Sequence, residues 1–453
     1  MLRSGSNFTG ISLKGQTGWP KFQVTHSAGW REMIAPLNQQ DKATLALADP
    51  AVIVAALTRY RNAAVPPWLS AVNHFPDGVL PTGPVAFGGV SAQDMSELIA
   101  VRGPLHAVDG WSYLGRALAS LLSGQVHAAR HLSYYAELRA GLSILASAGV
   151  GIFNRQNAVL DANGDVHIMS RRGTHEMAWL ALSEWAARAS SIEHLISPIR
   201  FAGGSLLDPF QEFFPGGAST AIGELMIEWG FDLQQGLVDR NQRNWSSYQP
   251  TALGPILTRP VDDAAFFQMF WQAVRPNGVE LERHLLRILL ETEARSLNAG
   301  VADYEHRYER LQAGTKNVVS FGFLTRVVDA YDHQFLTYLA DRAAPAHPYA
   351  MLCRAGLLLK LAIGMAEENL RAAGVQPTQH FNDWWQDFGA QQGLWPPGNP
   401  PEATVDLWSD IELALEDCAA APTGHRHEWI TALAGNAIRM CETERAALWG
   451  LFQ

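Results

Sequence analysis

Lysine is scarce in this chain, where 29 of the 34 basic residues are arginines. The lysines are Lys14, Lys21, Lys42, Lys316 and Lys360, and none of them is followed by serine or threonine. The Gly-Lys-Ser/Thr sequence that brings an ammonium group to nucleotide phosphates is therefore missing. The Ser-x-x-Lys and Gly-x-Ser-x-Gly motifs of serine-dependent hydrolases and the signatures of protein kinases are missing too. These absences argue against a P-loop NTPase, a hydrolase of these serine-dependent classes and a protein kinase.

Cysteine is also rare, and the three cysteines, Cys353, Cys418 and Cys441, lie far apart in the sequence. They form no Cys-x-x-Cys pair, so the pattern indicates neither a structural zinc site nor a disulfide framework. The N-terminal segment has no apolar run of signal-peptide length, and the most apolar predicted helix contains Lys360. We expect a cytoplasmic protein without a membrane span and without a bound cofactor.

The length and charge of the chain set further bounds. With 453 residues it exceeds the roughly 250–300 residues at which one hydrophobic core stops growing, which predicts two domains. Its apolar share of 47% and charged share of 17% are typical of a folded globular protein. The formal net charge of −10 gives no support to nucleic-acid binding, although a local arginine groove is compatible with an acidic total.

Apolar residues at helical spacing recur through most of the chain, so we expect a mainly α fold. An α+β N-terminal domain is predicted for residues 1–255 and an all-α bundle for residues 256–453. Asn163-Gly164 suits a tight turn, and the apolar runs beside it predict a β-hairpin. Residues 191–258 give mixed signals apart from one short helix. Residues 41–63 have helical spacing, and Pro50 marks a break or the first turn of a second helix there. The expected strands are 157–161 and 165–170, and the other expected helices are 91–103, 110–123, 125–147, 174–190, 221–229, 262–273, 279–297, 303–312, 321–342, 348–373, 381–388, 405–420 and 428–451.

One predicted helix combines a polar strip with an apolar one. His127, His131, Tyr135 and Arg139 follow each other at intervals of four residues, which places them on one helix face. We expect Glu137 and Arg139 to pair with a neighbouring helix, as internal ties of a buried scaffold. On this basis Arg139→Ala destabilises the protein more than a surface substitution does, because it leaves a partly buried carboxylate unpaired.

The same helix has a second interpretation, as one wall of a small-molecule pocket. Tyr135 and Arg139 lie one turn apart, and His175 begins the helix that follows the hairpin. An aromatic ring, a cation and an imidazole are groups that orient a ligand in a pocket. We therefore predict Tyr135, Glu137, Arg139 and His175 as candidate binding residues.

Two histidine pairs have spacings compatible with metal chelation. His127 and His131 are one helical turn apart, but the glutamate that accompanies such pairs in helical zinc sites is missing. His425 and His427 precede the last predicted helix, beside Glu428, where exposed side chains are the simpler interpretation. We therefore predict no metal site.

The order of features in residues 129–179 resembles that of YaaC-like proteins, a prokaryotic group of largely uncharacterised function. The segment runs from ARHLSYYAELRAGLSILA through a glycine-rich turn, AGVGIFN, to the hairpin and GTHEMAW. Some YaaC-like proteins resemble HEPN helical domains, many of which are metal-independent ribonucleases of toxin and phage-defence systems. The resemblance thus implies a ribonuclease as one possible function.

The HEPN resemblance also implies a catalytic pair, an arginine followed a few residues later by a histidine. In this pair the histidine transfers a proton and the arginine stabilises the phosphorane charge. Chance alone predicts about three such pairs in a chain of this composition. Those present are Arg188/His194, Arg326/His333 and Arg342/His347. Only Arg326 and His333 fall inside a long predicted helix, two turns apart, and they are the candidate catalytic residues.

Three functions stay open on the sequence. The first is a protein that acts through contacts with a partner or with a second copy of itself, as a subunit or effector of a phage-defence-type system. The second is a HEPN-like ribonuclease that uses Arg326 and His333. The third is a small-molecule sensor with a pocket at Tyr135, Arg139 and His175. The interaction protein requires an exposed apolar patch, and the ribonuclease requires a basic cleft. The sensor requires a pocket that includes Arg139.

Overall fold

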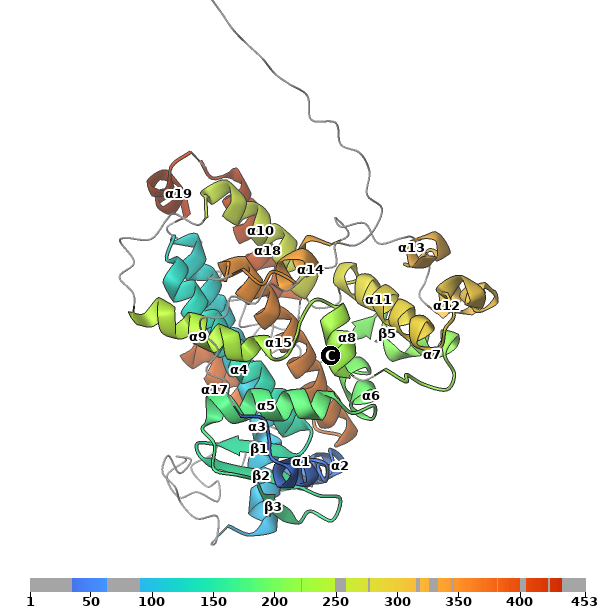
Figure 1. Ribbon diagram of the computed structural model, residues 1–453. Helices are drawn as coiled ribbons and strands as arrows, with labels where there is room; N and C mark the ends of the chain where they lie inside the picture. The colour runs from blue at the N-terminus through green and yellow to red at the C-terminus, as the bar shows by residue number, and fades with distance from the viewer. Residues whose placement is uncertain are drawn as a thin grey trace, which may run out of the picture.

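Figure 1 shows the computed structural model of the chain. Helices dominate the described residues and the strands are short, which confirms the predicted mainly α fold. The structure describes residues 35–62, 90–220, 222–248, 258–275, 278–314, 318–325, 333–343, 346–380, 382–399, 405–422 and 424–433.

The elements up to residue 248 include all the described strands. Their bounds are α1 (Gln39–Leu45), α2 (Ala51–Asn62), α3 (Ala92–Leu122), α4 (Val126–Ser147), β1 (Val150–Phe153), β2 (Gln156–Leu160), β3 (Val166–Ile168), α5 (Thr174–Ala186), α6 (Ser191–Ile196), β4 (Arg200–Phe201), β5 (Gly204–Ser205), α7 (Leu207–Phe213), α8 (Ile222–Glu228) and α9 (Gln235–Tyr248).

The described elements beyond residue 258 are all helical. Their bounds are α10 (Pro260–Val274), α11 (Glu280–Ser296), the 3-10 helix η3 (Val301–Arg307), α12 (Tyr308–Gly314), α13 (Phe321–Thr325), α14 (Gln334–Leu339), α15 (Pro348–Ala372), α16 (Pro377–His380), α17 (Asn382–Gln391), α18 (Val405–Ala420) and α19 (Arg426–Leu433).

The centre of the fold is a bundle of α3, α4 and α15 (Figure 1). A short turn joins α3 to α4, and α15 packs against both. Gly110 of α3 permits this close approach, since a Cβ there would overlap Leu359 of α15 and lie 3.2 Å from Arg139 Cβ of α4. α15 belongs to the predicted C-terminal domain yet packs into the N-terminal half, while the division near residue 255 stays a prediction.

α3 is one helix of 31 residues, and the predicted gap between residues 103 and 110 is wrong. Pro104 lies inside it, and a proline in a helix removes one backbone hydrogen bond. Packing along α4 and α15 keeps the chain helical at this point. A hydrogen bond of 2.6 Å from Ser143 Oγ of α4 to the Gly103 carbonyl adds to this packing.

The predicted β-hairpin is confirmed, and a third strand precedes it. β2 pairs antiparallel with β3 and, on its other side, with β1, where the sequence predicts only a glycine-rich turn. Gly164 in the β2–β3 turn has a φ of 82°, as the Asn-Gly sequence requires. Asp41 of α1 accepts hydrogen bonds from the backbone N (2.8 Å) and Oγ (2.6 Å) of Ser170, and so ties α1 to the chain after β3.

α15 is long and apolar enough to cross a membrane by length and composition alone, and no other helix of the described residues is. However, 89% of its most apolar window is buried inside the protein. Lys360 on this helix donates a hydrogen bond to the Ala273 carbonyl (3.2 Å) and pairs with Glu282. α15 thus has the features of a core helix whose one lysine is paired.

Candidate functional site

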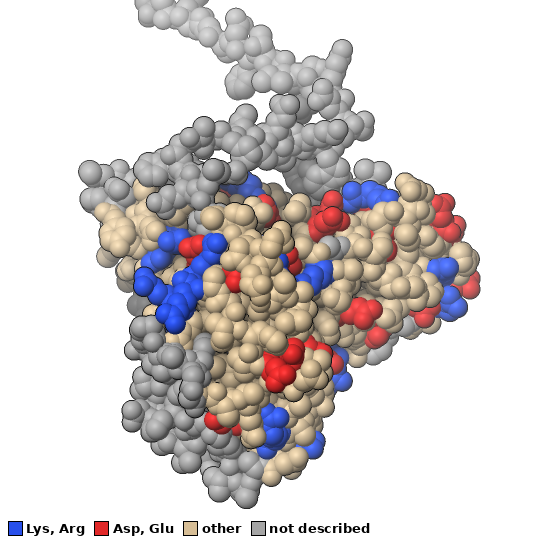
Figure 2. Space-filling model, turned by 60° about the horizontal axis from the view of Figure 1, so that its bottom comes forward, with Lys and Arg blue, Asp and Glu red and all other residues tan. Residues whose placement is uncertain are grey.

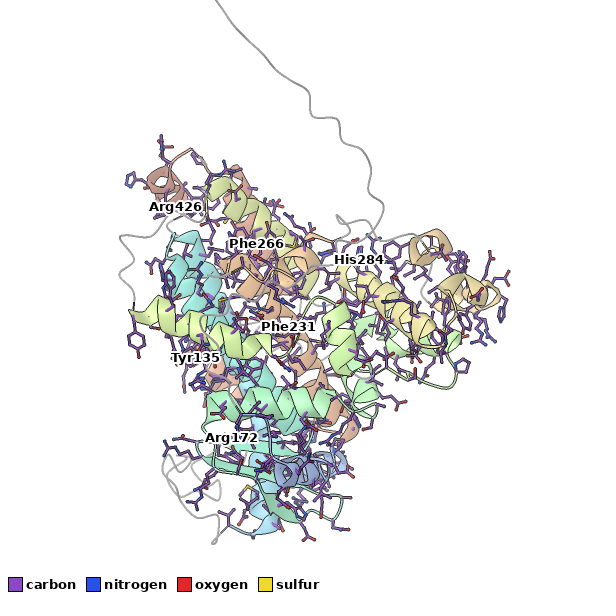
Figure 3. All side chains as sticks on the ribbon, in the orientation of Figure 1. Tyr135, Arg172, Phe231, Phe266, His284 and Arg426 are labelled. Carbon is purple, nitrogen blue, oxygen red and sulfur yellow. The ribbon has the colours of Figure 1, made fainter. Side chains whose placement is uncertain are left out.

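A cavity of about 480 Å³ lies between α4, the β1–β2 turn, the start of α5 and α9. Its volume falls within the range of about 300–1,000 Å³ that is typical of small-molecule sites. Figure 3 labels Tyr135, which lies beside α4 and below α9 in this view. The side chains on its walls are aromatic, apolar and basic, and include Tyr135, Leu138, Leu142, Arg139, Arg155 and Arg240.

The cavity carries an excess of positive charge. Arg139 Nε lies 3.2 Å from Asp109 Oδ2, and the one acidic residue of the lining, Glu176, is paired with Arg172 at 2.6 Å. Arg155 and Arg240 have no carboxylate within ion-pair distance among the described residues. Figure 2 shows Lys and Arg side chains gathered at the left of one face, the side on which Figure 1 draws α9. Such a concentration of positive charge attracts anions.

His175 contributes an uncharged imidazole to this basic cavity. Burial, and then the positive charges of Arg243, Arg240 and Arg139, lower the pKa of His175 to about 4. The hydroxyl of Tyr134 lies 2.8 Å from His175 Nδ1, and burial keeps this hydroxyl protonated by raising its pKa. When the hydroxyl donates to Nδ1, the Nε2–H of the neutral ring is left to donate to a ligand.

Arg155 occupies a strained position in the turn between β1 and β2. Its φ of 61° lies in the left-handed region, which glycine and asparagine adopt far more readily than arginine. The turn has only two residues, because Phe153 pairs directly with Gln156. Backbone strain of this kind costs on the order of 1–3 kcal/mol and is concentrated at functional sites. The strained turn holds the Arg155 side chain, which is exposed, at the cavity.

The start of α5 forms another part of the wall. Gly173 is the N-cap and has no side chain to accept a hydrogen bond, and Gly173, Thr174 and His175 all line the cavity. The first N–H groups of a helix have no intrahelical acceptor and carry a partial positive charge. Thr174 is the first helical residue. This helix start therefore adds N–H donors to the positive charge of the arginines.

α9, which carries Arg240, packs unusually closely on α5. A Cβ on Gly236 would overlap the indole ring of Trp179, which is buried in α5. The glycine therefore sets the distance between these helices and, through it, the position of Arg240 at the cavity. The neighbouring Arg243 lies over the Tyr135 ring, with its guanidinium carbon 5.5 Å from the ring centroid.

A buried charged cluster anchors α9 to the core from its other side. Arg354 of α15 donates two hydrogen bonds to Asp239 of α9, from Nε (2.7 Å) and Nη2 (2.9 Å). Glu137 of α4 lies 3.7 Å from Arg354 Nε, and all three side chains are fully buried. Burial and the charge of Asp239 raise the pKa of Glu137 well above its usual value, which exceeds the opposing effect of Arg354. Burial thus favours the neutral form of Glu137 beside the Asp239–Arg354 ion pair.

The structure brings three of the four predicted binding residues together. Tyr135, Arg139 and His175 line the same cavity, whereas Glu137 is buried with Arg354 on a different side of α4. The predicted reason for a destabilising effect of Arg139→Ala, a partly buried carboxylate left unpaired, is also wrong. The carboxylate that pairs with Arg139 belongs to Asp109, whose side chain is 52% exposed. The buried group that depends on Arg139 is the imidazole of His106, whose Nδ1 lies 3.0 Å from Arg139 Nη1.

Of the candidate catalytic pair, Arg326 lies outside the described residues. His333 does not lie inside a helix, as the sequence predicts, but precedes α14 as its N-cap, with the extended backbone angles φ −142° and ψ 119°. Its Nδ1 accepts a hydrogen bond from the Phe335 backbone N at 3.2 Å. Because His333 has extended backbone angles, the prediction that it lies inside a helix, on one face with Arg326, is wrong for His333. The predicted helix 321–342 is replaced by α13 and α14 in the described residues.

In the other two arginine–histidine pairs, the arginine and the histidine do not share a helix. Arg188 lies in the turn after α5, and His194 is exposed on α6, so this pair crosses a helix end as the sequence predicts. Arg342 donates a 2.6 Å hydrogen bond to the Gly230 carbonyl, and His347 is the N-cap of α15.

The histidine pairs considered for metal are engaged elsewhere or exposed. His131 Nδ1 lies 2.9 Å from Ser247 Oγ, and the His127 ring lies 5.1 Å from that of Trp245. His425 and His427 are exposed at the start of α19. In the part of the chain that the structure describes, no group of three His, Cys, Asp or Glu side chains is arranged to hold a metal ion.

Sequence reasoning missed Arg155 and Arg240, the two lining arginines without a carboxylate partner among the described residues. α9 is largely polar and most of its apolar side chains are exposed, so the sequence does not mark it as a core helix. One signal for this helix was available, since residues 237–249 contain no glycine or proline to interrupt a helix. For Arg155 the sequence offers only its place between two apolar runs.

Comparisons with known proteins give this chain no relatives: it matches no family model, no curated protein and no solved structure. The resemblance of residues 129–179 to YaaC-like proteins therefore stays a prediction. The cytoplasmic location and a role in phage defence stay predictions as well. A functional proposal for this chain therefore depends on the residues and geometry of the cavity itself.

Proposed function

We propose that this protein is a small-molecule sensor that binds an anionic ligand in the cavity between α4, α5 and α9. The observation that carries the proposal is the convergence of Arg155 and Arg240 on one cavity, where neither has a carboxylate partner among the described residues. Unpaired arginines at the wall of a cavity of about 480 Å³ leave positive charge available to a ligand.

The chemistry of the wall favours a phosphate or carboxylate group joined to an apolar or planar body. Guanidinium groups bind both anions through pairs of parallel hydrogen bonds. The free N–H groups at the start of α5 add donors suited to the same anions. Leu138, Leu142 and the Tyr135 ring offer an apolar surface for the remainder of the ligand.

Thermal unfolding and calorimetric titration with adenosine monophosphate, inorganic phosphate, citrate and uncharged adenosine test the proposal. We expect at least one of the three anions to bind and to raise the unfolding temperature, since a ligand that binds only the folded state stabilises it. Adenosine should have no effect. The proposal fails if none of the anions binds at millimolar concentration, or if adenosine binds as tightly as its monophosphate.

Three single variants connect binding to this cavity. Arg155→Ala and Arg240→Ala should each weaken binding of the anion at least about tenfold, because each removes charge-assisted hydrogen bonds. Arg171→Ala is the matched control, since Arg171 is exposed and does not line the cavity. Equal losses in all three variants would mean that the anion responds only to the net charge of the protein.

A second candidate function, action through protein contacts, is favoured by the outer face of α9. Val238, Trp245 and Tyr248 are 43%, 41% and 82% exposed, and their spacing places them along one side of the helix. Because α9 also carries Arg240, the same helix would contact both a ligand in the anion cavity and a partner on its outer face. Light scattering of the wild type and of Val238→Glu/Tyr248→Glu tests whether a second copy binds there. A monomeric wild type would exclude self-association through this face.

A further inference from the structure

The charged side chains on the wall of the anion cavity, between α4, α5 and α9, do not balance one another. Arg139, Arg155 and Arg240 line the cavity. Glu176 is the one acidic residue of the described lining, and its carboxylate already accepts a 2.6 Å hydrogen bond from Arg172 Nη1. With three arginines and one glutamate, the lining carries two more positive than negative charges. A singly charged ligand would leave part of this excess unmatched.

A further basic group, Arg102 of α3, lies close to Arg139. Its guanidinium carbon lies 4.4 Å from the centroid of the Phe153 ring, and its Nε is buried without a hydrogen-bond partner in the described residues. Burial, and then the charge of Arg139, lower the pKa of Arg102 to about 9. Asp109 is the one carboxylate of the described residues within ion-pair distance of either arginine, and its side chain is 52% exposed. The excess of positive charge therefore extends beyond the wall of the cavity.

The donors that line the cavity come from three separate elements. Arg155 belongs to the β1–β2 turn, Arg240 to α9, and the free N–H groups to the start of α5. The Asn157 side chain donates hydrogen bonds to the carbonyls of Ser170 (2.8 Å) and Arg172 (3.3 Å), and so ties the strand after the turn to the residues just before α5. Donors on three elements suit a tetrahedral group with three terminal oxygens better than a planar carboxylate with two.

His175 stays uncharged over the pH range in which a phosphate monoester changes its charge. Burial, and then the charges of the nearby arginines, lower the pKa of His175 to about 4, whereas the second pKa of a phosphate monoester is about 6. Between pH 5.5 and pH 7.5 a change in anion binding therefore reports the charge of the ligand and not that of this imidazole. The charged or titratable groups around the imidazole are Tyr134, Tyr135, Arg139, Glu176, Arg240 and Arg243.

We propose, building on the proposed function, that the ligand of the anion cavity is a phosphate monoester bound as its dianion. Its two charges match the excess positive charge of the wall, and its three terminal oxygens accept hydrogen bonds from Arg155, Arg240 and the start of α5. A carboxylate has one charge and two oxygens, so it satisfies fewer of these donors. The body of the ester lies against Tyr135 and Leu138.

Calorimetric titration with two matched pairs of esters tests this assignment. Phenyl phosphate is compared with phenyl sulfate, and adenosine monophosphate with adenosine 5′-sulfate, because within each pair the shape is similar while the phosphate has two charges and the sulfate one. At pH 7.5 at least one phosphate should bind about tenfold or more tightly than its sulfate. At pH 5.5 this ratio should be about three- to fourfold smaller, because most of the phosphate has then taken up a proton and the sulfate has not.

The inference is overturned if neither phosphate ester binds at millimolar concentration, or if each binds no more tightly than its sulfate. It is also overturned if the ratio of affinities does not change with pH. Equal and measurable binding of phosphate and sulfate would leave the proposed anion site intact. The proposed function itself fails only if adenosine monophosphate, inorganic phosphate and citrate all fail to bind.

Variants of the lining connect the ratio of affinities to the charge of the cavity. Arg155→Ala and Arg240→Ala should each reduce the preference for phosphate over sulfate to about threefold or less, because each removes one of the excess positive charges. Arg171→Ala is the matched control and should keep the ratio of the wild type, since Arg171 is exposed and does not line the cavity. Circular dichroism at the titration temperature establishes that each variant is folded. An unchanged ratio in both folded lining variants would overturn the assignment, as would an equal drop in Arg171→Ala.

Discussion

Gly236 of α9 lies against the indole ring of Trp179 in α5, where no side chain larger than hydrogen fits without a shift of one helix. Trp179 is 1% exposed, so its ring cannot move outward to make room. The spacing of α5 and α9 decides how far Arg240 lies from the start of α5, and both belong to the wall of the anion cavity. The fit of one glycine on one tryptophan thus controls the shape of the proposed site.

Gly236→Ala should therefore destabilise the protein and weaken anion binding together. Alanine favours a helix over glycine by up to about 1 kcal/mol, but forcing a methyl group into a packed core costs about 1–3 kcal/mol. Urea unfolding and titration with the anion measure the two effects. Gly223→Ala is the matched control, since Gly223 is also the second residue of its helix and its Cβ would meet nothing closer than 3.7 Å. If both variants are as stable as the wild type, the contact with Trp179 does not fix α9.

The buried cluster of Glu137, Asp239 and Arg354 predicts very different losses of stability for two substitutions. Arg354→Met should lower the free energy of unfolding by about 3–5 kcal/mol, because it leaves the buried Asp239 carboxylate without its cation. Glu137→Gln should lower it by less than about 1 kcal/mol, since burial favours the neutral form of the Glu137 carboxyl group and an amide is also neutral and of similar size. Urea unfolding of both variants at neutral pH measures the difference. Similar losses would show that Glu137 is ionised and is itself a principal partner of Arg354.

The low pKa of His175 predicts a loss of stability in weak acid. Between its unfolded value of about 6.5 and its folded value of about 4, the unfolded chain binds a proton that the folded protein does not. Stability from this group is therefore complete above pH 6.5 and is lost as the pH falls towards 4. Further histidines have lowered pKa values and act in the same direction, namely His106, His127, His131 and His333.

Thermal unfolding of the wild type and His175→Gln from pH 7 to pH 4 isolates the contribution of this residue. The unfolding temperature of the variant should fall less over this range, because glutamine does not titrate. His194→Gln, at an exposed position on α6, is the matched control and should keep the profile of the wild type. Parallel profiles for all three proteins would mean that His175 does not gain a proton on unfolding.

Local sequence patterns predicted the elements whose stability is mostly local. The apolar spacing of α4 and the Asn-Gly turn of the hairpin are examples, and both elements lie within two residues of the predicted bounds. α9 was missed because its residues are largely polar, and it is held by a few specific contacts such as Asp239 with Arg354. The continuity of α3 through Pro104 was missed for a related reason, since packing against distant helices outweighs the local cost of the proline.

The candidate site divides in the same way. Tyr135 and Arg139 are one turn apart, so their shared face follows from helix geometry alone, and both line the cavity. Glu137 is two residues from Tyr135, which rotates it by about 200° around the helix and explains why it faces the core instead. Arg155 reaches the cavity from the strained β1–β2 turn, and Arg240 reaches it from α9, about a hundred residues after Tyr135 and Arg139 in the sequence. No spacing in the sequence encodes that convergence, because it depends on the packing of Gly236 on Trp179.

A carboxylate placed at the start of α5 should compete with the anionic ligand for the same donors. Gly173 is the N-cap, its φ of −66° suits any residue, and a Cβ there would meet nothing within 4 Å. Aspartate is among the preferred N-cap residues and is stabilised by about 0.3–1 kcal/mol near a helix N-terminus. Gly173→Asp should therefore keep or slightly raise the unfolding temperature while it weakens binding of the anion at least about tenfold.

Gly173→Ala completes this test, because it adds a side chain at the same place without a charge or an acceptor. It should bind the anion nearly as well as the wild type, although alanine is a poor N-cap and costs up to about 1 kcal/mol of stability relative to glycine. Loss of binding in both variants would mean that a side chain at residue 173 simply blocks the cavity. Full binding in Gly173→Asp would show that the anion does not use the start of α5, and would leave Arg155 and Arg240 as the groups that hold it.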